Sequence, residues 1–326
     1  MIKKEACFLG IDTSNYTTSV AICDMDGTVI ANFKQLLSVE MGERGLRQSD
    51  AVFSHIKNLP EMLSEVGEYL SERDILAVGY SAFPRDAEGS YMPCFLVGKN
   101  SAYAVSAGTG AAIYPFSHQN GHIMAALYSS GAMELMSVER FAAFHVSGGT
   151  TEILMVTPSK TSFSVEKIGG TADLNFGQGI DRVGVKMGLK FPCGREMEGL
   201  SLKNTNKIRR FKISVNGLTC NASGLENQAV KLFCETGDRE LVSASVFDFA
   251  GRTLLSLTEK LTEKYGEISV VYSGGVMSNS IIKNMLAERK NTFFAEPEYS
   301  SDNAAGIALL CRKKYLSENG DKNGSI

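Results

Sequence analysis

Residues 7–22, CFLGIDTSNYTTSVAI, contain two short apolar runs joined by a turn rich in hydroxyl groups. The runs Cys7–Ile11 and Ser19–Ile22 are typical of buried β-strands, and the turn between them carries one acid, Asp12. A third strand is expected over Thr28–Phe33. The segment therefore predicts a β-meander with one carboxylate at its first turn.

The same pattern recurs about 130 residues later. Phe141–Val146 is an expected strand, and Glu152–Val156 is its return strand after a turn of glycine and hydroxyl residues. Ser162–Ile168 is the expected third strand. An internal repeat of this kind predicts two similar α/β lobes that face each other across a cleft. A chain of 326 residues is long enough for two such lobes.

Two Ser-Gly-Gly turns follow expected strands, at Ser147–Gly149 and Ser273–Gly275. Glycine has no Cβ, so the backbone N–H groups of such a turn can approach an anion closely. The pair of turns indicates phosphate or nucleotide binding. The alternative is that both are tight strand-exit turns without a ligand.

Two of the four histidines, His118 and His122, are four residues apart in an expected helix for which Ser117 is the N-cap. Residues at i and i+4 share one helix face, so both imidazoles can bind one metal ion. Asp302 is the best candidate for a third, oxygen ligand. The alternative is a helix face with two solvated or core histidines. Gln119 cannot act as a general base, which disfavours the peptidase chemistry of HExxH motifs.

Asp181 is a lone acid among apolar and small residues of another expected helix. A carboxylate in a cleft is suited to accept hydrogen bonds from ribose hydroxyls. A surface ion pair with Arg182 or Lys186 is the alternative.

Composition excludes several classes of protein. Hydrophobic residues make up 44% of the chain and charged residues 21%, and no apolar run approaches the roughly 20 residues that span a bilayer. Seven scattered cysteines without CxxC spacing predict reduced thiols and a cytoplasmic protein without a membrane partner. The net charge is −3, but one run of cations is either a solvated face or a phosphate-backbone footprint. The run comprises Lys203, Lys207, Arg209, Arg210 and Lys212.

In this order, the motifs resemble the tRNA threonylcarbamoyladenosine transferase family (TsaD-type proteins, formerly sialoglycoprotein endopeptidases) over nearly the whole chain. Gly10–Ile22 is similar to the family's GIETSCDETSVAI, and the two histidines match its HxxxH metal pair. The other matched positions are Val146, Ser147, Gly148, Gly149 and Thr150 on the nucleotide loop VSGGH, Asp181 on GEAFD, Gly194 on the second glycine of PGG, Gly274, Gly275 and Asn279 on SGGVxxN, and Asp302 on TDN.

The resemblance implies an α/β fold of the actin/Hsp70/sugar-kinase type, with two duplicated lobes and a central cleft. The expected lobes are residues 1–114 plus 296–326, and residues 115–295, the second carrying HxxxH and the nucleotide loops. The implied reaction is acyl transfer from threonylcarbamoyl-AMP to the exocyclic amine of an adenosine in a tRNA anticodon loop. The implied cofactors are one divalent metal ion (Fe²⁺ or Zn²⁺) on His118, His122 and Asp302 and an adenine nucleotide (ATP, AMP or threonylcarbamoyl-AMP). The implied partners are tRNA and helper proteins of the pathway or a paralogue.

Several cleft residues depart from the family pattern and favour a diverged paralogue. Asp12 stands where the family has Glu, and it is the expected catalytic acid. The other departures are Tyr16 for a second acid, Thr150 for the histidine of VSGGH, Gln178 for the glutamate of GEAFD, and a longer loop, Ala82–Tyr91, for GPG. Two alternatives therefore stand beside the transferase: an ATPase or phosphotransferase of the same fold, and a non-catalytic nucleotide-binding scaffold.

Overall fold

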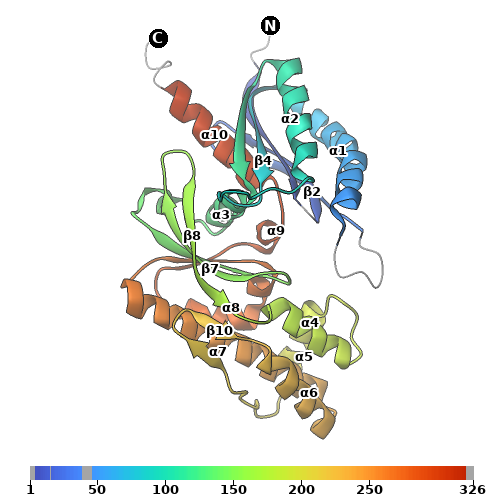
Figure 1. Cartoon of the computed structure of the whole chain (residues 1–326), viewed down its shortest axis with the longest axis vertical. Helices are drawn as coiled ribbons and strands as arrows, with labels where there is room; N and C mark the ends of the chain where they lie inside the picture. Colours follow the sequence, from blue (N-terminus) through green and yellow to red (C-terminus); the bar gives the residue numbers. More distant parts are fainter. Residues whose placement is uncertain (1–3, 15, 39–45, 321–326) are drawn as a thin grey trace. The chain divides into compact units, whose positions relative to one another are not determined.

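The structure is a computed structural model that describes residues 4–14, 16–38 and 46–320. The chain forms two compact units, each built on a sheet of its own (Figure 1). Unit 1 comprises Met1–Tyr128, Pro158–Ser164 and Ser301–Ile326. Unit 2 comprises Ser129–Thr157 and Val165–Ser300.

The sheet of unit 1 has the strand order β3-β2-β1-β4-β5. Strand β2 is antiparallel to both β1 and β3, which confirms the predicted meander. Strand β4 is parallel to β1, and β5 is parallel to β4. The bounds are β1 (Glu5–Ser14), β2 (Thr17–Asp24), β3 (Val29–Leu36), β4 (Arg73–Phe83) and β5 (Ala112–Ser117).

Helices cover both faces of this sheet. A Cβ on Gly10 of β1 would lie 2.5 Å from the carbonyl oxygen of Ala304, at the start of α10 (Ala305–Asn319). A Cβ on Gly98 of α2 (Phe95–Thr109) would lie 2.9 Å from Thr13 Oγ1 and 3.4 Å from Ile11. Successive strand residues point to opposite faces, so α10 and α2 lie on opposite sides of β1. Helix α1 (Gln48–Leu70) packs against β2 and β3 (Figure 1).

The sheet of unit 2 repeats the sheet of unit 1. Its order is β12-β11-β6-β7-β8-β10-β9, in which β8-β7-β6-β11-β12 corresponds to β3-β2-β1-β4-β5. Strand β7 is antiparallel to β6, β11 is parallel to β6, and β12 is parallel to β11. The predicted duplication is therefore present at the level of strand order. The bounds are β6 (Phe141–Val146), β7 (Thr151–Pro158), β8 (Phe163–Thr171), β9 (Ser214–Asn216), β10 (Thr219–Asn221), β11 (Val270–Ser273) and β12 (Thr292–Phe294).

The core of unit 2 forms between its sheet and the long helix α7 (Arg239–Tyr265). Phe144 and Tyr272 from the sheet are fully buried with Phe176 and Phe247 from the helices, because apolar residues recur on the inward faces of these elements. The remaining elements of the unit are η1 (Met133–Ser137), α4 (Phe176–Lys186), α5 (Gly194–Lys203), α6 (Gly224–Thr236), η2 (Gly275–Ser278), α8 (Ser280–Ala287) and α9 (Pro297–Ser300).

The division of the chain differs from the expected one, which put 115–295 in one lobe. Helix α3 (His118–Ser129) groups with unit 1 through Tyr128. The cause is a close approach of two helices: a Cβ on Gly306 of α10 would lie 1.9 Å from the carbonyl oxygen of Gly121 of α3. The two histidines therefore belong to unit 1, and the Ser-Gly-Gly turns belong to unit 2. Residues 296–300, expected in the first lobe, group with unit 2.

All seven cysteines are free thiols, and only Cys234 among them is exposed. None of the described helices is long and apolar enough to cross a membrane.

Candidate metal centre and glycine turns

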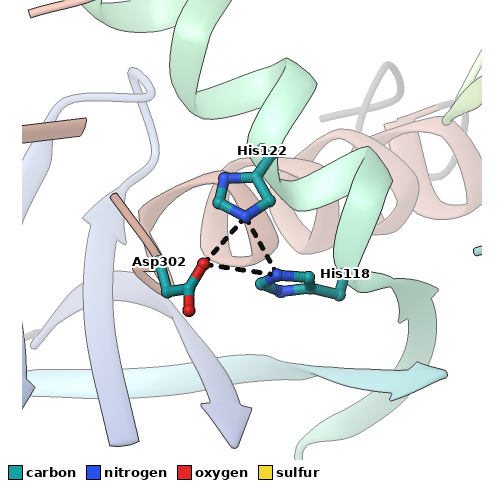
Figure 2. A group of neighbouring side chains, drawn as sticks. All are labelled: His118, His122 and Asp302. Atoms are coloured by element: carbon teal, nitrogen blue, oxygen red, sulfur yellow. Dashed lines mark hydrogen bonds and ion pairs between the residues drawn. The ribbon is translucent and has the colours of Figure 1, made fainter. Parts of the chain in front are cut away.

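Three side chains of unit 1, His118, His122 and Asp302, point toward one another (Figure 2). The Nε2 atoms of His118 and His122 are 2.9 Å apart. Asp302 Oδ1 lies 3.0 Å from His122 Nε2 and 3.5 Å from His118 Nε2. Within the described residues, this is the group of His, Cys, Asp or Glu side chains whose donor atoms could hold a metal ion. We call it the candidate metal centre.

The three donor atoms fit one metal ion in size and chemistry. Imidazole nitrogens and carboxylate oxygens bind Zn²⁺ at about 2.0–2.1 Å, which places tetrahedral ligands about 3.3 Å apart. The observed separations of 2.9–3.5 Å lie around that value. Two imidazoles and a carboxylate also suit Fe²⁺. The predicted convergence of these three side chains from distant parts of the sequence is present.

Asp12 lies behind the candidate metal centre. Its Oδ2 atom is 2.7 Å from His118 Nδ1, the ring nitrogen that points away from His122. The Asp12 side chain is only 1% exposed, and its Oδ1 atom accepts a hydrogen bond from the backbone N–H of Ser14. A carboxylate on the outer nitrogen fixes the tautomer and ring orientation of a metal-binding histidine. Asp12 was expected as a catalytic acid, whereas its contacts are those of an orienting group.

The charges of this group favour a cation. Burial lowers the pKa of His118, but the carboxylates of Asp12 and Asp302 outweigh that effect and raise the pKa to about 10. Burial raises the pKa of Asp302, but hydrogen bonds from His118 and His122 outweigh it and hold the pKa well below its usual range. In the protein without metal, the site therefore stabilises positive charge among its donors. A divalent cation can supply the same positive charge in place of the proton held by the histidines.

The start of α3 is fixed by a network of hydrogen bonds. Ser117 Oγ accepts from the backbone N–H of Asn120, as expected for an N-cap. The same hydroxyl donates to Asp86 Oδ2 at 2.7 Å, and Asn120 Nδ2 donates to that oxygen at 2.9 Å. Asp86 belongs to the loop expected to be longer than in the resembled family. This loop therefore holds the helix that carries both histidines.

The strand residues on either side of the turn after Asp12 are held by helices α1 and α2. The ring of His55 on α1 is fully buried, and its Nδ1 atom lies 2.8 Å from Thr18 Oγ1. Burial lowers the pKa of His55, so the ring is neutral near pH 7. From α2, on the same face of the sheet as α1, Gly98 N donates to Thr13 Oγ1, which in turn donates to the carbonyl oxygen of Cys94. The Asp12 backbone is thus tied to α1 and α2.

The first glycine turn follows β6 in unit 2. Ser147 N donates to the carbonyl oxygen of Thr150 at 2.7 Å and closes the turn. The start of α4 packs directly against it, because a Cβ on Gly177 would lie 2.6 Å from Gly148 Cα. Apart from its chain neighbours, no described residue has an atom within 4 Å of an added Cβ on Gly148 or Gly149, so the outer side of this turn is open. An open turn with bare backbone can accept a phosphate.

The second glycine turn lies beside the first. Strands β6 and β11 are parallel neighbours with His145 opposite Ser273, so both turns leave the same edge of the sheet. Gly274 adopts φ +99°, and a Cβ there would lie 2.3 Å from the carbonyl oxygen of Val146. Only glycine fits this position, because any side chain would collide with the end of β6.

The remaining predicted residues of unit 2 flank these turns but carry structural bonds as well. Asp181 Oδ1 accepts from the backbone N–H of Cys193 at 2.7 Å, next to Gly194 at the start of α5. Burial raises the pKa of Asp181, and this hydrogen bond opposes the rise. Asn279 Oδ1 caps α8 by accepting from two backbone N–H groups at 3.0 and 3.1 Å.

The basic run lies on the surface of unit 2, from the last residue of α5 into the segment that follows it. Its five cations are all exposed. Arg209 pairs with Glu235 at 2.7 Å. The backbone is held by α6 and α7, because Lys212 N donates to Gln228 Oε1 and Arg209 N donates to Ser245 Oγ. The run is thus an ordered basic strip rather than a loose loop.

Sequence reasoning did not find the contact between Asp12 and His118 or the role of Asp86. Asp12 was noticed as a buried-looking acid, but 106 positions separate it from His118. Asp86 lies in an irregular loop, where no periodic pattern signals a contact. In both cases the partner is set by strand order and helix packing.

Residues 39–309 match the family model of TsaD, tRNA N6-adenosine threonylcarbamoyltransferase. A tRNA N6-adenosine threonylcarbamoyltransferase of Streptococcus thermophilus (strain CNRZ 1066) is 30% identical over 342 residues, covering 95% of this chain and 94% of the relative. A probable bifunctional tRNA threonylcarbamoyladenosine biosynthesis protein of Thermoplasma acidophilum is 26% identical over 95% of this chain. The chain spans 56% of that longer relative.

Solved structures agree on the fold. A ROK family glucokinase of Streptomyces griseus aligns with 94% of this chain and 99% of its own, with 11% identity and a TM-score of 0.52. At this identity the likeness concerns the fold alone. Together with the repeated strand order, it confirms the predicted sugar-kinase-like α/β fold of two sheet-based units.

Proposed function

The chain belongs to the tRNA N6-adenosine threonylcarbamoyltransferase family, and on that premise we propose that it transfers a threonylcarbamoyl group from threonylcarbamoyl-AMP to the exocyclic amine of an adenosine in a tRNA anticodon loop. The observation that carries the proposal is the convergence of His118, His122 and Asp302 in unit 1. Because tRNA is the acceptor, the reaction would take place in the cytoplasm.

We assign one divalent ion, Fe²⁺ or Zn²⁺, to these three side chains. When bound, such an ion supplies Lewis-acid stabilisation of negative charge on a carbonyl or phosphate oxygen. The protein's contribution is to hold the three donors at fixed separations and to orient His118 through Asp12. Asp12, which stands where the resembled family has Glu, is long enough to reach the His118 ring in this chain.

The reaction needs little acid–base chemistry. The adenosine amine attacks the carbamoyl carbon, the bond from that carbon to the phosphate oxygen breaks, and AMP leaves with the electron pair, while the proton of the amine passes to the departing phosphate or to solvent. The mixed anhydride is already activated, so positioning can supply most of the rate. The backbone N–H groups of the Ser147–Thr150 and Ser273–Gly275 turns would bind the AMP phosphate. Asp181, Gly194 and Asn279 would hold the nucleoside.

The acceptor RNA would contact the basic strip of unit 2. Several exposed cations on an ordered backbone suit phosphate groups, whereas the chain as a whole carries a net charge of −3. We also propose that helper proteins of the pathway, or a paralogue, act together with this chain. The transfer assay is therefore run with and without them.

Metal content and single-turnover transfer test the proposal. Wild type, the double variant His118→Ala/His122→Ala and the control Gln119→Ala, on the same helix, are purified and assayed for bound metal and for transfer from threonylcarbamoyl-AMP to tRNA. We expect one metal per chain and modified adenosine for wild type and control, and neither for the double variant. Nucleotide binding without any transfer would instead identify a non-catalytic scaffold. Release of ADP from ATP and Mg²⁺ alone would identify a phosphotransferase.

A further inference from the structure

The most exposed aromatic side chain among the described residues is Phe191, on the loop that joins α4 to α5 in unit 2 (Figure 1). It is 74% exposed, although Leu189 and Cys193, two positions before and after it, are buried. An aromatic ring offers a large apolar surface that gains free energy when it leaves water. Phe191 is therefore a candidate contact for a flat ligand.

The backbone on both sides of Phe191 is fixed by hydrogen bonds to α4. Leu189 N donates to the carbonyl oxygen of Gly184 at 3.0 Å, and Cys193 N donates to Asp181 Oδ1 at 2.7 Å. Both acceptors belong to α4. The ring is thus presented from a defined place on the surface, and a ring positioned in advance loses little conformational entropy on binding.

Phe191 lies in a strongly basic part of the chain. Residues 186–212 contain eight Lys or Arg and two Glu, a net charge of +6, whereas the whole chain carries −3. All eight cations are exposed, and only Arg209 among them forms an ion pair with a described residue. This segment therefore suits a polyanion. The eight are Lys186, Lys190, Arg195, Lys203, Lys207, Arg209, Arg210 and Lys212.

Helix α5 connects the exposed ring to the basic strip. Phe191 lies three residues before Gly194, the first residue of α5, and Lys203 of the strip is the last residue of this ten-residue helix. Ten helical residues span about 15 Å. A stacked nucleic-acid strand rises about 3.4 Å per nucleotide, so about four or five nucleotides cover that distance. One RNA strand can therefore contact the ring and the strip together.

We propose that Phe191 stacks on an unpaired base of the acceptor RNA while the cations of residues 186–212 bind its phosphates. This inference rests on the proposed function, in which an RNA is the acceptor. Proteins bind single strands and splayed loop bases by placing aromatic rings beside cations. A base inside a duplex is already stacked on its neighbours, so the ring selects unpaired segments such as an anticodon loop.

The adenine of the donor is the other nucleobase in the proposed reaction. Gly194, assigned above to the nucleoside, is three residues from Phe191. The charges favour the RNA, because the AMP part of the donor has one phosphate and the segment offers eight cations. The two bases are distinguished by measuring the binding of AMP and of RNA on the same variants.

Binding of two RNAs tests the assignment. The first is an anticodon stem-loop, and the second is a blunt RNA duplex with the same number of phosphates. Dissociation constants are measured by fluorescence anisotropy at a series of salt concentrations, and AMP binding is measured by calorimetry. The proteins are wild type, Phe191→Ala, Phe191→Tyr and the control Phe53→Ala on α1, where the ring is 64% exposed. Thermal unfolding is measured for each variant.

We expect Phe191→Ala to bind the stem-loop about 5- to 100-fold more weakly than wild type, the range that stacking on one base contributes. The slope of log affinity against log salt should not change, because no charge is removed. The affinities of Phe191→Ala for the duplex and for AMP should equal those of wild type. Phe191→Tyr and Phe53→Ala should bind all three ligands as wild type does.

Unchanged stem-loop affinity in Phe191→Ala would overturn the assignment. Equal losses for the stem-loop and the duplex would also overturn it, since the ring would then not select an unpaired base. A loss confined to AMP would place the ring on the adenine of the donor instead. If wild type binds neither RNA, the proposed function fails as well, whereas RNA binding that does not depend on Phe191 refutes this inference alone.

Discussion

His118 Nδ1 lies 2.7 Å from Asp12 Oδ2, although 106 positions separate the two residues. The contact joins the C-terminal part of β1 to the first residue of α3. It makes one ring nitrogen of His118 face a carboxylate while the other faces His122 and Asp302.

Asp12→Asn should therefore weaken metal binding without removing a ligand. The variant keeps the shape of the side chain but loses the charge that orients and polarises His118. The loss of such an outer contact typically lowers metal affinity by about 10- to 100-fold. Titration with Zn²⁺ or Co²⁺ against a chromophoric chelator measures the change. Asp26→Asn, in the β2–β3 turn of the same unit, serves as the control and should bind as wild type does. Wild-type affinity in Asp12→Asn would show that the contact does not orient the ligand.

Gly306→Ala should destabilise unit 1 and separate the metal donors. A Cβ at this position would lie 1.9 Å from the backbone oxygen of Gly121, so α10 must move away from α3. Overpacking of this kind costs about 1–3 kcal/mol. Thermal unfolding and metal content should both fall. The matched control is Gly67→Ala in α1, where no described residue outside the helix's own turn has an atom within 4 Å of the new Cβ. That control should gain about 0.4–1 kcal/mol, because alanine suits a helix better than glycine. A Gly306→Ala protein as stable as wild type would contradict the packing described above.

Gly274→Ala should abolish nucleotide binding through the backbone. The added Cβ would lie 2.3 Å from the carbonyl oxygen of Val146, and φ +99° is unfavourable for alanine. Calorimetry with AMP should show no binding, and thermal unfolding should occur at lower temperature. At Gly275 an added Cβ meets no atom of the described residues within 4 Å apart from its chain neighbours, so Gly275→Ala should fold normally. Any loss of AMP binding by Gly275→Ala would then come from contact between the new side chain and AMP rather than from misfolding. Full AMP affinity in Gly274→Ala would exclude the turn as a phosphate site.

Charge reversal in the basic strip should weaken tRNA binding and reduce its dependence on salt. Lys207→Glu/Arg210→Glu removes up to two phosphate contacts, and each contact contributes about 1 to the slope of log affinity against log salt. Filter binding of tRNA at a series of salt concentrations gives that slope. Lys57→Glu/Lys99→Glu, on the helices of unit 1, changes the net charge equally and should leave the slope as in wild type. Equal slopes for the two double variants would show that the basic strip is a solvated surface that does not contact the RNA.

The elements themselves could be predicted from the sequence, whereas the way they pack could not. Apolar runs and turn residues located β6 at Phe141–Val146 with both bounds correct, and the repeated pattern predicted the repeated strand order. The i, i+4 spacing of His118 and His122 fixed their common face, because that relation is local to a helix. The sequence did not indicate to which unit α3 belongs. The assignment depends on the close contact between Gly121 and Gly306, and nothing in the sequence around a glycine indicates which residue it contacts.

The candidate site shows the same contrast. Asp302 was recognised from a motif, and its carboxylate lies where the motif implied. The orienting role of Asp12 depends on which face of β1 meets α3 and on the register of that strand. The strand register, and the side of the sheet to which each residue points, are fixed by the pairing of distant strands, so they could not be predicted from the local sequence.

Asp302 and α10 also set the order of events during synthesis of the chain. The ribosome makes Asp12 and both histidines early, but the third metal donor and the helix that packs against Gly10 and Gly121 follow after the whole of unit 2. The nascent chain therefore cannot complete the candidate donor set or the sheet-covering helix before residues 301–319 have been made. Under the proposed function, a product that stalls within unit 2 would lack one of the three metal donors.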